Sequence, residues 1–164
     1  MTSAEIRFHT LPSADEISSL EDLSETDSEI LSIYNNSKRQ PYAELELEEV
    51  HDLLDEFEDQ TCLIASPEDE PDEIATVANV DFKRGKQKAW IDGIATHPDY
   101  QGNKFGTEMM KFIEQESKVR ALAAIALNSV PNAIQFYVKA GYDIDDVQPS
   151  KQVDDRVMTK FLDQ

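Results

Sequence analysis

The sequence predicts an α/β fold, in which strands and helices alternate along the chain. Two observations indicate this class. Apolar residues alternate at strand spacing and then at helix spacing several times, and a glycine-containing loop over residues 97–106 separates a strand pattern from a helix pattern. A length of 164 residues suits one domain with its own core. We therefore expect a single domain over residues 1–164.

The first half predicts one strand followed by helices. Residues 5–11 have strand alternation, and residues 12–34 follow as two short helices with a break near residues 24–27. Residues 44–58 form an acidic amphipathic helix. The apolar side chains expected to face the core in these elements are Ile6, Phe8, Ile17, Leu20, Leu23, Ile30, Tyr34, Leu47, Val50, Leu54 and Phe57.

The middle of the chain predicts three strands. Residues 61–66 are a short apolar strand, and the proline-rich acidic segment 67–73 is a turn. Residues 74–82 are rich in β-branched side chains, and residues 83–88 connect them as a hairpin to a partner strand over 89–96.

The last third predicts helix, strand, helix and strand. A helix begins near residue 105, a buried strand covers residues 121–128, a second helix covers 131–142, and a final strand covers 154–162. Gly141 ends the second helix. The helix residues expected to face the core are Phe105, Met109, Phe112 and Ile113, then Ala133, Phe136, Tyr137 and Ala140.

Charge is distributed very unevenly. The chain has 34 acidic and 15 basic residues, a formal net charge of −19, and residues 1–82 carry 23 acids and three bases whereas residues 83–164 carry 11 acids and 12 bases. Nucleic acid is disfavoured as a partner, because phosphate contacts need clustered basic residues. Two interpretations are open: solvated acidic faces that keep the protein soluble, as in a salty cell, or a field that attracts cations.

Other signals exclude several classes of protein. No apolar run has membrane-spanning length and the first residues do not resemble a signal peptide, so we expect a cytoplasmic protein without a membrane partner. Cys62, the single cysteine, is expected to pack within a strand. His9, His51 and His97 share no metal-ligand spacing, so we expect solvated or capping histidines and no metal.

The segment HPDYQGNKFGTEMM, residues 97–110, has the composition of an anion site. A strand that ends at Thr96, a tight loop at Gly102 and a helix that starts near Gly106 would leave backbone amides without partners at a helix N-terminus. Glycine also permits close backbone approach to a ligand. This predicts a phosphate-like ligand, and the alternative is that the glycines serve only the turn.

Two motifs resemble those of the Gcn5-related N-acetyltransferase (GNAT) superfamily, over about residues 89–142. The family's pyrophosphate loop reads Arg/Gln-x-x-Gly-x-Gly/Ala, and its second motif runs from an Asn and an Ala to Phe-Tyr-x-x-x-Gly-Phe/Tyr. The first motif is matched by Gln101, Gly102, Asn103, Lys104, Phe105 and Gly106, and the second by Asn132, Ala133, Phe136, Tyr137, Gly141 and Tyr142.

The resemblance implies both a fold and a reaction. The fold is a mixed, mostly antiparallel sheet with helices on both faces, in which strands 89–96 and 121–128 are parallel and splay apart around acyl-CoA. The reaction is direct transfer of an acetyl group from acetyl-CoA to a primary amine, on a small molecule or a peptide. It also implies that the acidic half, about residues 1–82, lines the acceptor side, and that about residues 83–164 hold most of the acetyl-CoA site. Homodimers are frequent in families of this type.

The resemblance also assigns roles to residues. Asp92 is the expected general base, and the alternative is an aspartate held on a strand face. Tyr137 is expected to protonate the leaving thiolate, and the alternative is a core aromatic residue. A backbone amide near residues 94–96 would polarise the thioester carbonyl. The residues expected to contact the cofactor are Ile94, Ala95, Thr96, Gln101, Gly102, Asn103, Lys104, Phe105, Gly106, Thr107, Asn132 and Tyr137.

One position departs from the family pattern. Lys104 replaces the first glycine of the loop motif, and its Cβ limits backbone approach while its ammonium could add charge to the same phosphates. This leaves two alternatives to an enzyme that acetylates a cationic amine. One is a non-catalytic acyl-CoA-binding module of the same fold, and the other is an interaction protein whose acidic helices cover a basic partner.

Overall fold

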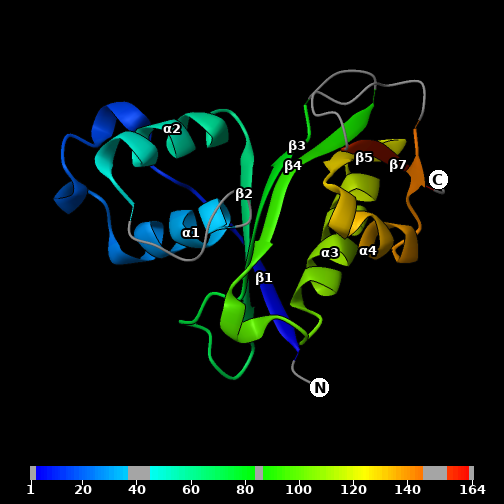
Figure 1. Ribbon diagram of the computed structural model, residues 1–164, viewed down its shortest axis with the longest axis horizontal. Helices are drawn as coiled ribbons and strands as arrows, with labels where there is room; N and C mark the ends of the chain where they lie inside the picture. Colours follow the sequence, from blue (N-terminus) through cyan, green and yellow to red (C-terminus); the bar gives the residue numbers. More distant parts are fainter. Residues whose placement is uncertain (1–2, 37–44, 84–86, 146–154, 163–164) are drawn as a thin grey trace. The chain divides into compact units, whose positions relative to one another are not determined.

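A seven-stranded sheet organises the chain. The computed structural model describes residues 3–36, 45–83, 87–145 and 155–162, and Figure 1 shows its elements. The strand order is β1-β2-β3-β4-β5-β7-β6. The strands are β1 (Ala4–His9), β2 (Thr61–Pro67), β3 (Thr76–Asp81), β4 (Lys88–Thr96), β5 (Ala124–Ser129), β6 (Asp143–Ile144) and β7 (Arg156–Phe161).

The sheet is mixed and mostly antiparallel, as expected. β1 pairs with β2, and β2 with β3, in antiparallel register. β4 and β5 are parallel, while β7 runs antiparallel to both β5 and β6. The prediction of an α/β fold with this type of sheet is therefore confirmed. The two-residue strand β6 was not predicted, because it is too short to show any alternation.

Contacts divide the chain into two compact units. Unit 1 comprises Met1–Val80 and Gly93–Met109, and unit 2 comprises Asp81–Asp92 and Met110–Gln164. The boundary therefore passes through β4 and through helix α3 (Phe105–Val119). Counted by unit, unit 1 carries 24 acidic and four basic residues, and unit 2 carries 10 acidic and 11 basic residues.

The helices of unit 1 differ in part from expectation. Helices α1 (Glu25–Asn36) and α2 (Leu47–Phe57) are present, but the segment before α1 forms only two 3₁₀ turns, η1 (Ala14–Glu16) and η2 (Leu20–Asp22). The predicted helix there is wrong because side chains bind the local backbone amides. Asp22 Oδ2 accepts from the N–H groups of Ser18 and Ser19, at 2.9 and 3.1 Å.

The predicted break near residues 24–27 is where α1 begins. Ser24 caps the helix, since the N–H of Asp27 donates to its Oγ at 3.0 Å and the N–H of Ser28 donates to its carbonyl at 2.9 Å. Leu20, which belongs to the 3₁₀ segment, is 47% exposed and does not join the core.

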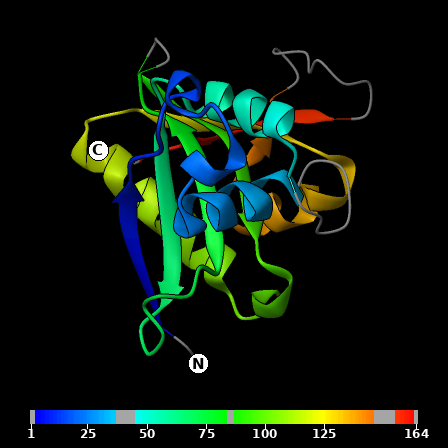
Figure 2. The same cartoon turned by 90° about the vertical axis from the view of Figure 1, so that its left-hand side faces the viewer.

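The core of unit 1 lies between its helices and strands. In Figure 2, α1 and α2 lie against the same face of the strands of this unit. The buried side chains there come from α1, α2, β2 and β3, and they include Ile30, Tyr34, Leu54, Phe57, Cys62, Ile64 and Val77. Cys62 is thus a packed strand residue, as predicted. Phe8 was expected to be buried but is 52% exposed, because β1 is an edge strand.

Unit 2 pairs β5 with β7 and packs helices on that ladder. The unit holds the C-terminal part of α3, the 3₁₀ turn η4 (Pro131–Ala133) and helix α4 (Ile134–Lys139). Lys160 Nζ of β7 donates to Glu114 Oε2 of α3 at 2.8 Å and to the carbonyl of Ala140 at 2.9 Å. This one side chain therefore joins β7 to α3 and to the end of α4.

Gly141 ends α4, as predicted. Its φ is +98°, a conformation that favours glycine, and a Cβ there would lie 3.1 Å from Lys160 Cε. Phe136, expected in the core, is 39% exposed, because α4 is only six residues long and buries Tyr137 instead. The predicted hairpin over residues 83–88 lies partly outside the described residues.

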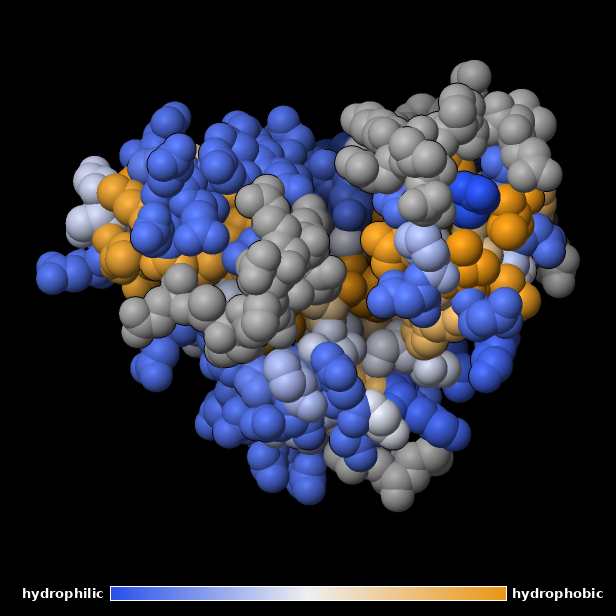
Figure 3. Space-filling view, viewed as in Figure 1, coloured by the Kyte–Doolittle hydropathy of each residue, from blue (hydrophilic) through white to orange (hydrophobic). Residues whose placement is uncertain are grey.

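The described surface is mostly hydrophilic. Figure 3 shows hydrophilic side chains gathered over α2, and apolar side chains reaching the surface over α4. The exposed apolar residues of unit 2 include Phe136, Val138, Ile144 and Phe161. Among the described residues, no helix is long and apolar enough to cross a bilayer.

Candidate functional site

The end of β4 is anchored to β3 within unit 1. Thr96 Oγ1 lies 3.0 Å from Thr76 Oγ1, and the N–H of His97 donates to the carbonyl of Ala75 at 2.7 Å. These two contacts hold the point at which the chain leaves the sheet. The loop that follows therefore begins from a fixed position.

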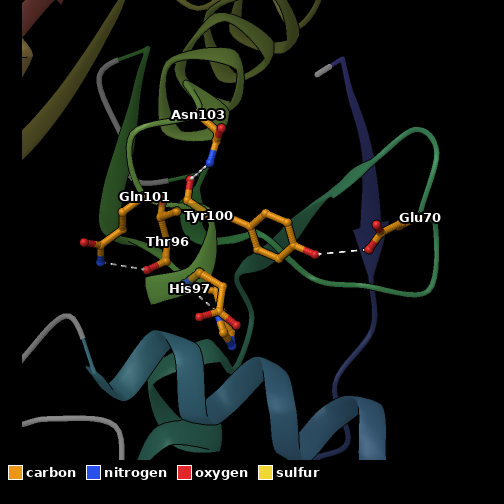
Figure 4. A network of polar contacts seen from close by, with 7 residues as sticks. Glu70, Thr96, His97, Tyr100, Gln101 and Asn103 are labelled. Atoms are coloured by element: carbon orange, nitrogen blue, oxygen red, sulfur yellow. Dashed lines mark hydrogen bonds and ion pairs between the residues drawn. The ribbon is translucent and has the colours of Figure 1, made fainter. Parts of the chain in front are cut away.

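A 3₁₀ turn, η3 (Pro98–Tyr100), leads from β4 into this loop, and Figure 4 shows its polar contacts. The His97 side chain caps the turn, since its Nδ1 accepts from the N–H of Asp99 at 3.0 Å. Gln101 Nε2 reaches back to the carbonyl of Thr96 at 3.3 Å. The capping role expected for His97 is confirmed, and Gln101 acts as a brace across the loop.

The loop contains two residues in the left-handed region. Gly102 has a φ of +86° and Lys104 a φ of +68°. A Cβ on Gly102 would have nothing within 4 Å in the protein, so this position needs glycine for its conformation. Lys104 takes the glycine-like conformation although it has a Cβ, a strain that costs roughly 1–2 kcal/mol. Its backbone thus has a conformation that glycine adopts readily, and its side chain is exposed.

Helix α3 starts directly after Lys104. The N–H of Glu108 donates to the carbonyl of Lys104 at 3.0 Å, which is the first bond of the helix. The N–H groups of Phe105, Gly106 and Thr107 precede that bond and have no acceptor within the helix. The predicted strand, loop and helix N-terminus are therefore adjacent, in an arrangement that favours an anion.

Phe105 fixes the first turn of α3. Its side chain is only 2% exposed, and its ring meets the Tyr100 ring edge-on with a centroid separation of 5.5 Å. Phe105 can therefore contribute to a ligand only through its backbone. Its ring secures the helix start against η3.

Carboxylates surround this region of unit 1. The Tyr100 hydroxyl donates to Glu70 Oε2 at 3.4 Å, and partial burial together with Glu70 and Glu73 raises the pKa of Tyr100. Burial, and then Glu73, raises the pKa of Glu29 on α1. An anion that binds the loop must therefore be held by local amides and by Lys104, against the charge of the unit.

The Tyr34 side chain fills the space in which a side chain on Gly93 would lie. A Cβ on Gly93 would lie 2.4 Å from the hydroxyl oxygen of Tyr34, which is fully buried on α1. Asn79 Nδ2 donates to that hydroxyl at 3.4 Å. This contact between a helix and β4 has no signal in the sequence, because nothing in the local pattern of either segment pairs Tyr34 with Gly93. Of the residues that follow, Ala95 is buried, and Ile94 and Thr96 are partly exposed.

Asp92 lies where the parallel ladder of unit 2 ends. The register with β5 runs from Lys88↔Ala124 to Ile91↔Leu127, and Asp92 is the next residue of β4. Its side chain is partly exposed. The assignment of Asp92 as a base remains a prediction.

Asn132 and Tyr137 lie five residues apart on η4 and α4 of unit 2. Asn132 is exposed, whereas Tyr137 is 8% exposed and its ring contacts those of Phe136 and Tyr142. Burial raises the pKa of Tyr137 to about 12. The hydroxyl is therefore protonated at neutral pH, as a general acid must be.

The histidines do not form a metal site. His9 Nε2 lies 2.6 Å from Asp27 Oδ1, and His51 Nε2 lies 2.6 Å from the carbonyl of Ile17. Among the described residues, no group of histidine, cysteine and carboxylate side chains could hold a metal ion.

Known proteins resemble this chain in sequence motif and in fold. Residues 28–142 match the family model described as Acetyltransferase (GNAT) family. The ribosomal-protein-S18-alanine N-acetyltransferase from Escherichia coli is similar in structure, with 16% identity, a TM-score of 0.65, and coverage of 99% of this chain and 96% of that one. No curated protein matches the sequence.

Two further similar structures contain the cofactor. The PaiA N-acetyltransferase from Thermoplasma acidophilum in complex with coenzyme A has 19% identity and a TM-score of 0.62, covering 97% of this chain and 99% of that one. An acetyltransferase from Bacillus subtilis in complex with CoA has 17% identity and a TM-score of 0.65, covering 98% of this chain and 99% of that one. Because the family model matches residues 28–142, the chain belongs to the acetyltransferase (GNAT) family and is an acetyl-CoA-dependent N-acetyltransferase.

Proposed function

We propose that this enzyme transfers the acetyl group of acetyl-CoA to a primary amine that carries positive charge, by direct attack in a ternary complex. The observation that carries the proposal is the loop before α3, where Gly102 and Lys104 are both left-handed and the amides of the first helical turn are available. The charge of unit 1 supports the choice of acceptor.

The loop fits the diphosphate of CoA. Backbone amides at a helix N-terminus are donors aimed at an anion, and Gly102 leaves the backbone open to close approach because a Cβ there would meet nothing within 4 Å. The amides of residues 102–107 would hold the diphosphate, with the exposed ammonium of Lys104 beside them. Asn132 would bond the amides of the pantetheine arm. Bound acetyl-CoA supplies an activated acetyl thioester.

The acceptor amine must lose a proton before it can attack. An alkyl ammonium has a pKa near 10 and has no lone pair in its protonated form. We assign the base to Asp92, directly or through a water molecule, because it follows the last residue of β4 that pairs with β5 and is partly exposed. A backbone N–H of residues 94–96 would polarise the thioester carbonyl.

Tyr137 would protonate the departing thiolate. Burial raises the pKa of its hydroxyl to about 12, so it holds its proton at every pH of a normal assay. The O–H proton moves to the thiolate sulfur, and the phenolate left behind takes a proton from solvent before the next turnover. The same burial is what a core aromatic residue would have, and only kinetics separates the two roles.

The acceptor is expected to be cationic. Unit 1 has 24 acidic residues against four basic residues, and such an excess raises the local concentration of cations. Polyamines, basic peptides and protein N-termini near basic residues belong to this class. One protein of similar structure is named as a ribosomal-protein-S18-alanine N-acetyltransferase, which supports the inclusion of peptides among the acceptors to be tested.

Thiol release from acetyl-CoA tests the proposal. The panel would contain a polyamine, a basic peptide, a neutral amine of similar length and an acidic peptide. We expect release that depends on the amine and is fastest with the first two. Tight acetyl-CoA binding with no release on any amine would favour a non-catalytic CoA-binding module. Recovery of a basic partner without acetyl-CoA dependence would favour an interaction protein.

A further inference from the structure

Unit 1 contains a pocket of about 480 Å³ that the proposed reaction does not use. It is formed by the end of β1, the segment that leads to η1, the end of α2 and the start of β2. The lining residues are Phe8, His9, Thr10, Leu11, Pro12, Ser13, Glu16, Leu54, Phe57, Glu58, Asp59, Gln60, Thr61 and Cys62. The volume lies within the range of small-molecule sites.

The pocket lies at the far end of the sheet from the cofactor loop. His9 pairs with Cys62, and Thr61 pairs with Val80 at the end of β3, whereas the cofactor loop leaves β4 beside Ala75 and Thr76 at the start of β3. Thr76 and Val80 of β3 are about 13 Å apart at strand spacing. Figures 1 and 2 both show α2 and η3 at opposite ends of unit 1.

The wall of the pocket has one sign of charge. Glu16, Glu58 and Asp59 contribute carboxylates, and none of the described residues that line it is a lysine or an arginine. The basic side chain His9 is already bonded to Asp27 at 2.6 Å. A cation is therefore favoured in this pocket, and an anion is disfavoured.

The floor of the pocket is apolar and aromatic. Leu54 and Phe57 of α2 are 2% and 5% exposed, and Phe8 of β1 is 52% exposed. Aromatic faces attract cations, and the aliphatic side chains suit a short hydrocarbon body. A hydrated metal ion would gain nothing from such a floor.

A residue that lines the same pocket carries a buried hydrogen-bond acceptor. Gln60 Oε1 is inaccessible to solvent and has no hydrogen-bond partner among the described residues. Buried polar atoms are normally satisfied, so this oxygen lacks a donor among the described residues. A rotation of the Gln60 side chain, which is partly exposed, would present the oxygen to an N–H group of a ligand.

We propose that this pocket binds a small organic ammonium ion, with the charged nitrogen near Gln60 and the carboxylates and the hydrocarbon body against Phe8 and Phe57. The site is separate from the acetyl-CoA loop and does not depend on the proposed acceptor. Asp59 lies at its rim with a φ of +62°, a conformation that asparagine also accepts, so its charge can be removed without new backbone strain.

Calorimetric titration of the full chain with 1,4-diaminobutane, in the absence of acetyl-CoA, tests this site. We expect binding to the parent and much weaker binding of 1,4-butanediol, which has the same chain length without charge. Glu58→Gln combined with Asp59→Asn should weaken diaminobutane about tenfold. Asp52→Asn combined with Asp55→Asn makes the same charge change on α2 outside the lining, and should change affinity less than about twofold.

Two further variants test the floor and the buried acceptor. Phe8→Ala alters an exposed side chain, so the fold should survive, and binding should weaken severalfold. Gln60→Met removes the hydrogen-bond acceptor while keeping a side chain of similar volume, and it should also weaken the binding of diaminobutane. Parental affinity in the Glu58/Asp59 double variant, equal binding of the diol, or no binding at millimolar diaminobutane would overturn the proposal.

Two measurements separate this site from the reaction. Diaminobutane should still bind a Gly106→Val protein, whose cofactor loop is blocked. The Glu58/Asp59 double variant should keep the parental KM for the acetyl acceptor. If that KM rises in step with the lost affinity, the pocket is the acceptor site itself and the second site is refuted.

Discussion

The two units of this enzyme differ in charge and in the kind of residue that each contributes. Unit 1 has a net charge of −20 and contains the loop proposed to bind the cofactor, whereas unit 2 has a net charge of +1 and contains Asp92, Asn132 and Tyr137. If this loop holds the diphosphate, the net charge of its unit does not attract the cofactor. Local backbone amides would then provide the affinity, and the acidity would serve something else.

With these assignments, acetyl-CoA binding depends on residues of unit 1, and proton transfer depends on residues of unit 2. Changes in the loop of unit 1 should act on acetyl-CoA affinity, and changes at Asp92 or Tyr137 in unit 2 should act on turnover. The expected effects follow from the largest to the smallest.

Gly106→Val should abolish acetyl-CoA binding. A branched side chain in the first turn of α3 would occupy the space in front of the amides. We therefore expect the affinity for acetyl-CoA to fall by about a hundredfold or more, which corresponds to roughly 2.7 kcal/mol of binding free energy. Calorimetry measures the affinity, and circular dichroism checks the fold. Gly106→Ala is the matched control, because the family loop accepts alanine at this position. Unchanged affinity in a folded Gly106→Val protein would remove the loop from the site.

Tyr137→Phe should lower kcat by about a hundredfold and leave acetyl-CoA affinity nearly unchanged. Because burial raises the pKa of Tyr137 to about 12, the hydroxyl is protonated below that pH, and the loss should be equal at pH 6 and pH 9. Steady-state kinetics at both values measure it. Parental turnover in this variant would leave Tyr137 with only a packing role.

Asp92→Asn should lower the rate most at low pH, by about tenfold or more. Most of the amine is protonated there, so removal of a base matters most, and the loss should shrink as the pH approaches the amine pKa near 10. Asp143→Asn, an exposed change in the same unit, is the control. A loss independent of pH would point to a structural role for Asp92.

Lys104 tests whether charge or backbone path matters in the loop. Lys104→Glu should weaken acetyl-CoA about tenfold, whereas Lys104→Gly should keep the affinity, because it exchanges a charge for closer approach. The glycine variant should also raise the unfolding free energy by about 0.5 kcal/mol, since φ at this position is +68°. Lys111→Glu on the same helix is the control. If Lys104→Glu binds like the parent, the side chain simply faces solvent.

Salt should change the two Michaelis constants differently. Screening weakens the attraction between unit 1 and a cationic acceptor, so the acceptor KM should rise severalfold between low and high salt. The acetyl-CoA KM should change less, because amides hold the diphosphate within an acidic unit. If both constants move together and the acceptor panel shows no dependence on charge, the acidity serves solubility or salt adaptation.

Much of the fold follows from the sequence because the signals are local. The alternation in residues 61–66 and 89–96, the apolar stripe from Phe105 to Ile113 and the break at Gly141 each depend on residues that are neighbours in the chain. The loop is also a local feature, since Gly102 and the start of α3 lie within a few residues. Such patterns can be read without knowing what the segments touch.

The errors arise where side chains compete with the backbone or where the sheet has an edge. Asp22 binds two amides and turns a helix-spaced segment into 3₁₀ turns, so Leu20 is exposed. Phe8 has the correct strand spacing but lies on an edge strand, where one neighbour is absent. Neither outcome is visible in the spacing of apolar residues.

The sequence by itself determined the class of fold and the family, because these depend on short ordered motifs. Only the tertiary structure decided that Lys104 adopts the conformation of a glycine, that Gly93 faces Tyr34, and that Phe8, Gln60 and Asp59 line one pocket. The contact at Gly93 and the pocket lining join residues up to about sixty positions apart, brought together by strand pairing and core packing, and such long-range contacts leave no periodic trace in the chain.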